Sequence, residues 1–179
     1  MKTLATLAAA AVLLSSAAFA QSVGEKTGVN STLGISPTTA DFVKEAALSD
    51  MLEIESSKIA QQKGNADEKK FAGQMVTDHT KTSSELKSMV SSGDVKAEIP
   101  ASLDSSSQSK LDKLRNAKPE DFAGQYDPMQ VSAHKDAVSL FERYAKGGDN
   151  AKLKDWAGKT LPALQHHLEM AQDMDKNRK

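Results

Sequence analysis

In the segment 71-FAGQMVTDHTKTSSELKSMV-90, apolar side chains recur at spacings of three and four residues. This spacing places them on one face of an α-helix. The face includes one imidazole, because His79 follows Met75 by four residues and Val76 by three. Side chains on the apolar face of a helix point into the protein interior. The segment therefore predicts a long amphipathic helix that buries a histidine.

The same spacing continues in both directions along the chain, between residues that start or stop helices. Thr38 or Thr39 is suited to cap a first helix, and Gly64 to end it. Asn65, with Glu68 three residues later, is typical of a capping box at the start of the next helix. In chain order, the predicted helices cover residues 38–63, 65–91, 119–146 and 150–176.

A long connection joins the second predicted helix to the third. Residues 92–118 hold Gly93, Pro100 and a serine cluster, with room for one short helix around Leu111 and Leu114. The other two connections are short, so the first helix pairs with the second and the third with the fourth. The sequence therefore predicts an all-α fold, a ferritin-like four-helix bundle with one long crossover between helices 2 and 3. We expect this domain to span residues 38–177.

The N-terminal residues have the pattern of a secretion signal. Lys2 precedes an apolar run, and Ala18-Phe19-Ala20 offers small residues at both positions that a signal peptidase recognises. We therefore expect a signal peptide over 1–20, cleaved after Ala20, and a periplasmic or secreted protein. Residues 21–37 are rich in Gly, Ser and Thr and are predicted to be a flexible leader. No transmembrane segment is expected after cleavage.

Composition and motifs exclude several classes of function. The 179 residues carry 23 Lys and Arg against 24 Asp and Glu, so no basic excess exists to bind nucleic acid. The absence of cysteine excludes disulfides, thiolate metal sites and a cysteine nucleophile. The sequence contains no glycine-rich phosphate loop, nucleophile elbow or H-E-x-x-H motif. It therefore favours a non-enzymatic protein. A homodimer is possible, and no protein partner can be identified.

Three of the four histidines interrupt apolar helix faces at a similar depth. His79, His134 and His167 lie about 13, 14 and 17 residues into their helices, which at about 1.5 Å per residue places them within roughly two turns of one another. His166 lies one position off the apolar face, and we expect it to face outward. On the first helix Glu53 lies at the same level, with Glu55 as the rival acid.

Three imidazoles and one carboxylate at a common level are suited to a single Zn, Fe or Cu ion. We therefore predict His79, His134, His167 and Glu53 as metal ligands, with Asp78 as an outer partner. The alternative is a purely structural or interaction bundle with a buried network that fixes the register of the helices. In that network the imidazoles hydrogen-bond to Glu53, Glu55, Tyr126 or Tyr144.

A di-iron centre does not fit the sequence. Di-iron bundles place a glutamate three residues before a ligating histidine on two of their helices. Here the residues three before the candidate histidines are all aliphatic, namely Val76, Val131 and Leu164. An oxidase that acts on reactive oxygen species is therefore the weakest of the candidate functions.

Four blocks of the sequence resemble a known family, namely 41-DFVKEAALSDMLEIESSKIAQQ-62, 71-FAGQMVTDHTKTSSELK-87, 134-HKDAVSLFERYAK-146 and 161-LPALQHHLEMA-171. Over residues 40–174 the chain is similar to a ferritin-like family of secreted bacterial domains of unknown function, often labelled predicted outer-membrane proteins. The resemblance implies a ferritin-like four-helix bundle with no established activity. It also implies that the family pattern places histidines at His79, His134 and His167 and an acid at Glu53.

These observations together predict a periplasmic protein with a binding or envelope-stress role. We expect it to hold a single metal ion at the centre of the bundle rather than to catalyse a reaction. The buried histidine network without a metal remains the alternative.

Overall fold

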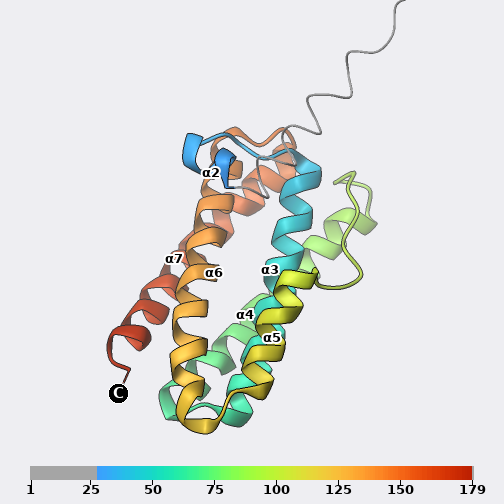
Figure 1. The fold of residues 1–179 in the computed structure, drawn as a ribbon. Coiled ribbons are helices and arrows are strands. Elements are labelled where there is room, and N and C mark those ends of the chain that lie inside the picture. The colour runs from blue at the N-terminus through green and yellow to red at the C-terminus, as the bar shows by residue number, and fades with distance from the viewer. Residues whose placement is uncertain (1–27, 179) are drawn as a thin grey trace, which may run out of the picture.

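The computed structural model describes residues 28–178, and within that range the chain is all-helical, with no strand. Figure 1 shows its six helices, which are α2 (Val29–Leu33), α3 (Thr39–Lys63), α4 (Ala66–Ser91), α5 (Ser105–Asn116), α6 (Pro119–Gly147) and α7 (Ala151–Lys176). None of the helices in this range combines the length and the apolar character that crossing a membrane requires. The predicted signal peptide lies outside the described residues.

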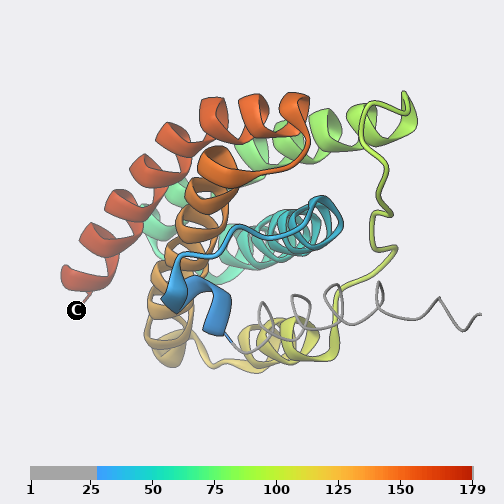
Figure 2. The same ribbon diagram turned by 90° about the horizontal axis from the view of Figure 1, so that it is seen from above.

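Four long helices form the body of the molecule. Helix α3 packs along α4 and α6 packs along α7, while α3 also contacts α6 and α4 contacts α7. Figures 1 and 2 show α5 beside α3, on the outside of the four long helices. The connection that contains α5 leads back to the end of the molecule where α4 begins, so α6 starts there and runs parallel to α4 (Figure 1).

The predicted helix starts are confirmed by their capping contacts. The Asn65 side chain accepts hydrogen bonds from the backbone N–H groups of Asp67 and Glu68, and the Glu68 carboxylate accepts one from the Asn65 N–H in return. Thr38 and Asn150 cap α3 and α7 by the same principle, and Pro119 opens α6. Each cap satisfies N–H groups that have no partner inside the helix.

The N-terminal part of the domain differs from the predicted leader. Residues 29–33 form the short helix α2, where a flexible segment over 21–37 is expected. Gly28 and Gly34 both adopt left-handed backbone conformations, which allows a single helical turn to close between them. The Ser31 and Ser139 hydroxyls, 2.8 Å apart, then tie α2 to α6. Residues 21–27 lie outside the described range.

The buried apolar residues form two clusters at opposite ends of the four long helices. One is built around Phe42, whose ring stacks on Tyr144 with the ring centroids 4.1 Å apart. The other is built around Phe71, Tyr126 and Met75. Between the clusters each long helix contributes buried polar side chains, which are Asp50, Glu53, His79, Gln130, His134 and His167. A polar layer therefore divides the apolar core at mid-length.

Lys63 fixes the connection that carries α5. Its Nζ donates to the carbonyl oxygens of Leu114 at 3.3 Å and Ala117 at 2.9 Å, and also to that of Arg115. These carbonyls lie at the C-terminal end of α5, where helix carbonyls lack partners within the helix. The last turn of α3 thereby holds the end of α5 against the body of the protein.

We predict that Lys63→Met lowers the free energy of unfolding by about 1–2 kcal/mol, because it removes charged hydrogen bonds to several carbonyls at once. Chemical denaturation measures the change. Lys58→Met is the matched control on the same helix, because Lys58 forms only an exposed ion pair with Glu55 and its loss costs about 0.5 kcal/mol or less. Equal effects of the two substitutions would contradict the anchoring role of Lys63.

Candidate metal centre

The three histidines predicted to converge do so in the structure. His79 on α4, His134 on α6 and His167 on α7 are only 2%, 1% and 3% exposed. Their ring centroids lie 5.6 or 5.7 Å apart in all three pairs, so the rings form a nearly equilateral triangle. One ring nitrogen from each lies within 4.8 Å of the other two.

Each imidazole is held from behind by a different hydrogen bond. His79 Nδ1 lies 2.8 Å from Asp50 Oδ1, and His167 Nε2 lies 2.9 Å from Asp78 Oδ2. His134 Nδ1 donates to the backbone carbonyl of Gln130 at 2.9 Å, because a carbonyl oxygen can only accept. The role predicted for Asp78, a partner behind a histidine, agrees with this geometry. Such partners fix which ring nitrogen carries the proton and how the ring is oriented.

The second nitrogen of each ring is buried and makes no hydrogen bond. These atoms are Nε2 of His79, Nε2 of His134 and Nδ1 of His167. A buried polar atom without a partner costs stability, so three together need an explanation. In a neutral imidazole whose other nitrogen donates a hydrogen bond, the free nitrogen is an acceptor and a metal ligand.

Two of the imidazoles are electrostatically suited to bind a cation. Burial, together with the charge of His79, lowers the pKa of both His134 and His167 to about 4. Both rings are therefore neutral at pH 7, and each keeps a lone pair available for a ligand.

His79 is coupled to the buried carboxylate of Asp50. Burial disfavours the charged form of His79, but the hydrogen bond and the charge of Asp50 outweigh it and raise the pKa of His79. Burial also disfavours the charged form of Asp50, and for a carboxyl group this raises the pKa. The Thr82 hydroxyl donates to the same Asp50 oxygen at 2.9 Å, which holds that oxygen in place. A cation bound at the free Nε2 of His79 would replace the proton that this nitrogen carries in the charged imidazole, while Nδ1 keeps its hydrogen bond to Asp50.

The acid at this level is Glu53 rather than Glu55. Glu53 is 1% exposed, and neither of its carboxylate oxygens has a hydrogen-bond partner. The Glu55 side chain is 42% exposed and pairs with Lys58 at 2.8 Å. Burial raises the pKa of Glu53 to about 7, against the opposing effects of His79 and Gln130. Within the described residues, the group of ligand atoms closer than 4.8 Å contains the three imidazoles and no carboxylate.

The structure also corrects the partners expected for a buried histidine network. Neither tyrosine named as a partner holds an imidazole. The Tyr126 hydroxyl lies 3.2 Å from that of Ser57, and the Tyr144 hydroxyl lies 2.5 Å from that of Thr39. Asp50 and the main chain of Gln130 take their place. Only Asp50 has a sequence signal, because it precedes Glu53 by one helical turn.

His166 faces away from the cluster, as its position in the sequence predicts. Its side chain is 63% exposed, and its Nδ1 lies 3.8 Å from the Glu169 carboxylate. Adjacent residues on α7 therefore place one imidazole in the core and one in solvent.

Three ring nitrogens, one from each histidine, lie close enough together to hold one metal ion. Nitrogens about 2.1 Å from a tetrahedral ion lie about 3.4 Å apart, so three ring nitrogens within 4.8 Å of one another need to approach by about 1.4 Å at most. Imidazole nitrogens suit Zn, Fe or Cu better than Mg or Ca, which prefer oxygen ligands. The metal ion predicted from the sequence stays a prediction.

The fold and this cluster together define an all-helical domain with three buried imidazoles facing one another at its centre. The chain belongs to the DUF4142 family of domains of unknown function, which matches residues 24–174. Comparisons with the curated proteins and with the solved structures give no match.

We predict that Glu53→Gln stabilises the metal-free protein above pH 7. The pKa of Glu53 rises from 4.5 to about 7 on burial, so above pH 7 the folded protein holds a charged carboxylate without a partner. The difference between the two pKa values corresponds to about 3 kcal/mol at most. Denaturant unfolding between pH 4 and 8 measures the gain.

The gain is largest above about pH 7 and disappears as the pH falls below 4.5, where folded and unfolded chains both carry a protonated Glu53. Glu55→Gln, two residues further along the same helix, removes only an exposed ion pair and should change stability by about 0.5 kcal/mol or less. A Glu53→Gln protein that is less stable than the wild type at pH 8 would show that the charged carboxylate is stabilised in the native protein.

Proposed function

We propose that this protein is a periplasmic metal-binding protein that holds one Zn, Fe or Cu ion between His79, His134 and His167. Glu53 supplies the nearby acidic group, as fourth ligand or as counter-charge to the ion. The protein binds the metal and serves the cell envelope through that binding, without catalysing a reaction. The metal centre is the part of this proposal that the geometry supports best.

One observation carries the proposal. Each of the three imidazoles has one nitrogen fixed by a hydrogen bond and the other buried without a partner, and one nitrogen from each meets the other two within 4.8 Å. Histidines that ligate metals show this arrangement, with a carboxylate or a carbonyl behind the ring. A bound ion would satisfy all three free nitrogens at once.

The location and the class of fold also belong to the proposal. A signal peptide over 1–20 would deliver the domain to the periplasm, where metal ions are acquired and exchanged. We assign the domain to the ferritin-like four-helix bundles, because α3 pairs with α4, α6 pairs with α7, and the long connection with α5 joins the two pairs. Bundles of this kind hold metals in their cores with side chains from facing helices.

A buried histidine network without a metal is the competing function. The hydrogen bonds from Asp50, Asp78 and the Gln130 carbonyl favour it, because they hold one nitrogen of each ring and link α3 to α4 and α4 to α7. Such contacts fix helix register. The network does not account for the other nitrogens, because a structural layer gains nothing from three buried ring nitrogens that lack hydrogen-bond partners.

We predict that His134→Leu abolishes metal binding and leaves the metal-free protein folded. The untagged mature chain is treated with a chelator, dialysed and titrated with Zn²⁺, Fe²⁺ or Cu²⁺, with binding followed by mass spectrometry and thermal unfolding. A metal at a hundredfold excess over its dissociation constant stabilises the native state by about 3 kcal/mol. The variant should lose this stabilisation entirely.

His166→Leu is the matched control, because it removes the exposed imidazole next to His167 and should bind the metal like the wild type. Equal loss in the two variants would place binding on the surface. No metal-dependent stabilisation with any of these ions would contradict the metal centre and leave the structural network. In that case His134→Leu should fold normally or gain stability, because it removes an unsatisfied buried nitrogen.

A further inference from the structure

A second polar region lies at the opposite end of the apolar cluster built around Phe71, away from the histidines. It is a cavity of about 640 Å³ between the start of α4, the first half of α6 and the end of α7. Cavities of this size accommodate small organic molecules. None of the three clustered histidines lines it.

Two buried carboxyl groups lie close together at this cavity, and only Asp127 lines it. Asp127 on α6 lines it, is 1% exposed and has an Oδ1 with no hydrogen-bond partner. Glu68 on α4 is also 1% exposed, and it lies close enough to raise the pKa of Asp127 to about 7, together with burial, which is the larger cause. One Glu68 oxygen accepts the Asn65 N–H at 2.6 Å, and the other has no partner. The two carboxyl groups also lie within hydrogen-bonding reach of each other, which favours the protonated form of Asp127.

The walls and the rim of the cavity differ in character. Phe71, Met170 and Met174 give the walls apolar surface, whereas the exposed Asp67 and Asp173 lie on the rim. Carboxyl groups therefore line the cavity together with apolar side chains. Asp175, whose Oδ1 lies 3.6 Å from Nη2 of Arg178, adds to the negative charge around Asp127.

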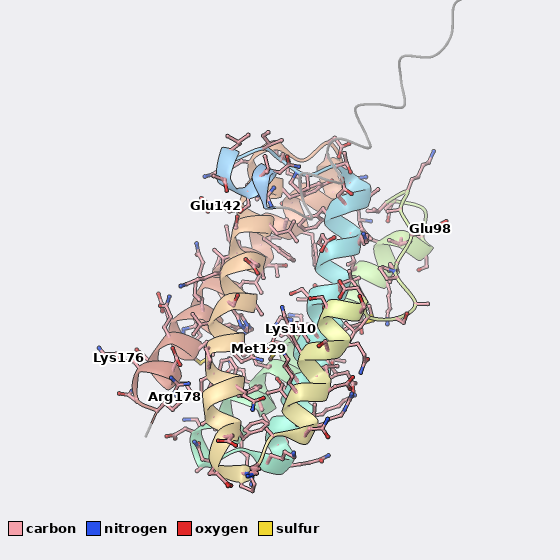
Figure 3. All side chains as sticks on the ribbon, in the orientation of Figure 1. Glu98, Lys110, Met129, Glu142, Lys176 and Arg178 are labelled. Atoms are coloured by element: carbon pink, nitrogen blue, oxygen red, sulfur yellow. The ribbon has the colours of Figure 1, made fainter. Side chains whose placement is uncertain are left out.

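Two basic side chains also line the cavity and offset part of its negative charge. They are Lys70 on α4 and Arg178, which Figure 3 labels at the C-terminal end of α7. Nη1 of Arg178 approaches to 3.8 Å of the position that a Cβ on Gly124 would occupy, one turn before Asp127. The charge of Arg178 lowers the pKa of Asp127, but burial and the neighbouring acids outweigh it. The lining residues include three carboxyl groups and two basic groups, which leaves a small excess of negative charge.

We propose that this cavity binds a linear aliphatic diamine. One ammonium group donates to Asp127 Oδ1 in the cavity wall and takes the place of the proton between Asp127 and Glu68. The methylene chain packs on Phe71, Met170 and Met174, where it is removed from water. The second ammonium group lies between Asp67 and Asp173 at the rim. Arg178 carries a positive charge near Asp127 and therefore competes with the ligand for the Asp127 carboxylate.

A metal ion fits this cavity less well than an organic cation. Within residues 28–178 the carboxylates here do not form a group of three ligand atoms close enough to share an ion, whereas the three imidazoles do. The apolar walls would give a metal ion no ligands. The diamine uses both the carboxyl groups and the apolar surface, and it does not depend on the metal centre.

Isothermal titration calorimetry with diaminopentane, which carries amino groups at both ends of its chain, tests the proposal on the full mature protein. We expect one saturable site. Pentylamine, which lacks the second ammonium group, should bind at least about tenfold more weakly, and pentanoate should not bind. No saturable binding of diaminopentane up to about 10 mM would overturn the proposal, as would equal binding of pentanoate.

Substitutions locate the binding within the cavity. Asp127→Asn keeps the shape of the side chain and should weaken diaminopentane at least about tenfold, because the buried ammonium loses its charged partner. Asp155→Asn, which removes one exposed carboxylate at the opposite end of α7, is the matched control and should bind like the wild type. Equal affinities of these two variants would show that the diamine binds elsewhere and would overturn the proposal.

Arg178→Gln keeps the test decisive if Asp127→Asn does not fold. Arg178 is exposed, so its replacement should leave the fold intact. Removal of the competing guanidinium should increase the affinity for diaminopentane several-fold. An affinity that is unchanged or lower would contradict the proposed position of the ligand beside Asp127.

Discussion

The arrangement of this protein depends on three buried imidazoles that are each tied by one nitrogen and free at the other. Asp50, Asp78 and the Gln130 carbonyl fix the rings, so the rings cannot turn to find other partners. The other nitrogens stay buried without a partner, and one nitrogen of each ring lies within 4.8 Å of the other two. Because α3 contributes Asp50 and Glu53 at the same level, all four long helices must keep one register for the cluster to exist.

This constraint explains why the apolar core is divided into two clusters. A continuous apolar core would be more stable, because burying polar groups without full hydrogen bonding costs free energy. The chain instead places an acceptor-rich layer at mid-length, with an unpaired carboxylate at Glu53. Residues that reduce stability in this way are typical of sites that bind ligands. The carboxyl pair of Glu68 and Asp127, beyond the cluster around Phe71, repeats the pattern on a smaller scale.

The sequence predicts the parts of this account that depend on local chemistry. Helix starts follow from side chains such as Asn65 and Glu68, whose capping contacts lie within their own first turn, and the inward direction of His79 follows from its spacing relative to Met75. Two of the three partners behind the rings are harder to predict than Asp78. The reach of Asp50 to His79 depends on how α3 is rotated against α4, and the carbonyl that holds His134 carries no side-chain signal at all.

The short helix α2 is also not predicted from the sequence, because composition does not show which glycines adopt left-handed conformations. The cavity beside Asp127 forms only where the end of α7 meets α4 and α6, far apart in sequence.

X-ray absorption spectroscopy of the mature protein loaded with one equivalent of Zn²⁺ tests the central claim most directly. The account predicts nitrogen ligands at about 2.0–2.1 Å, with the outer-shell scattering of three imidazoles. The spectrum should be the same for His166→Leu and should lose imidazole scattering in His134→Leu. A spectrum dominated by oxygen ligands, or one that depends on His166 rather than His134, would contradict a metal centre built from the three buried histidines.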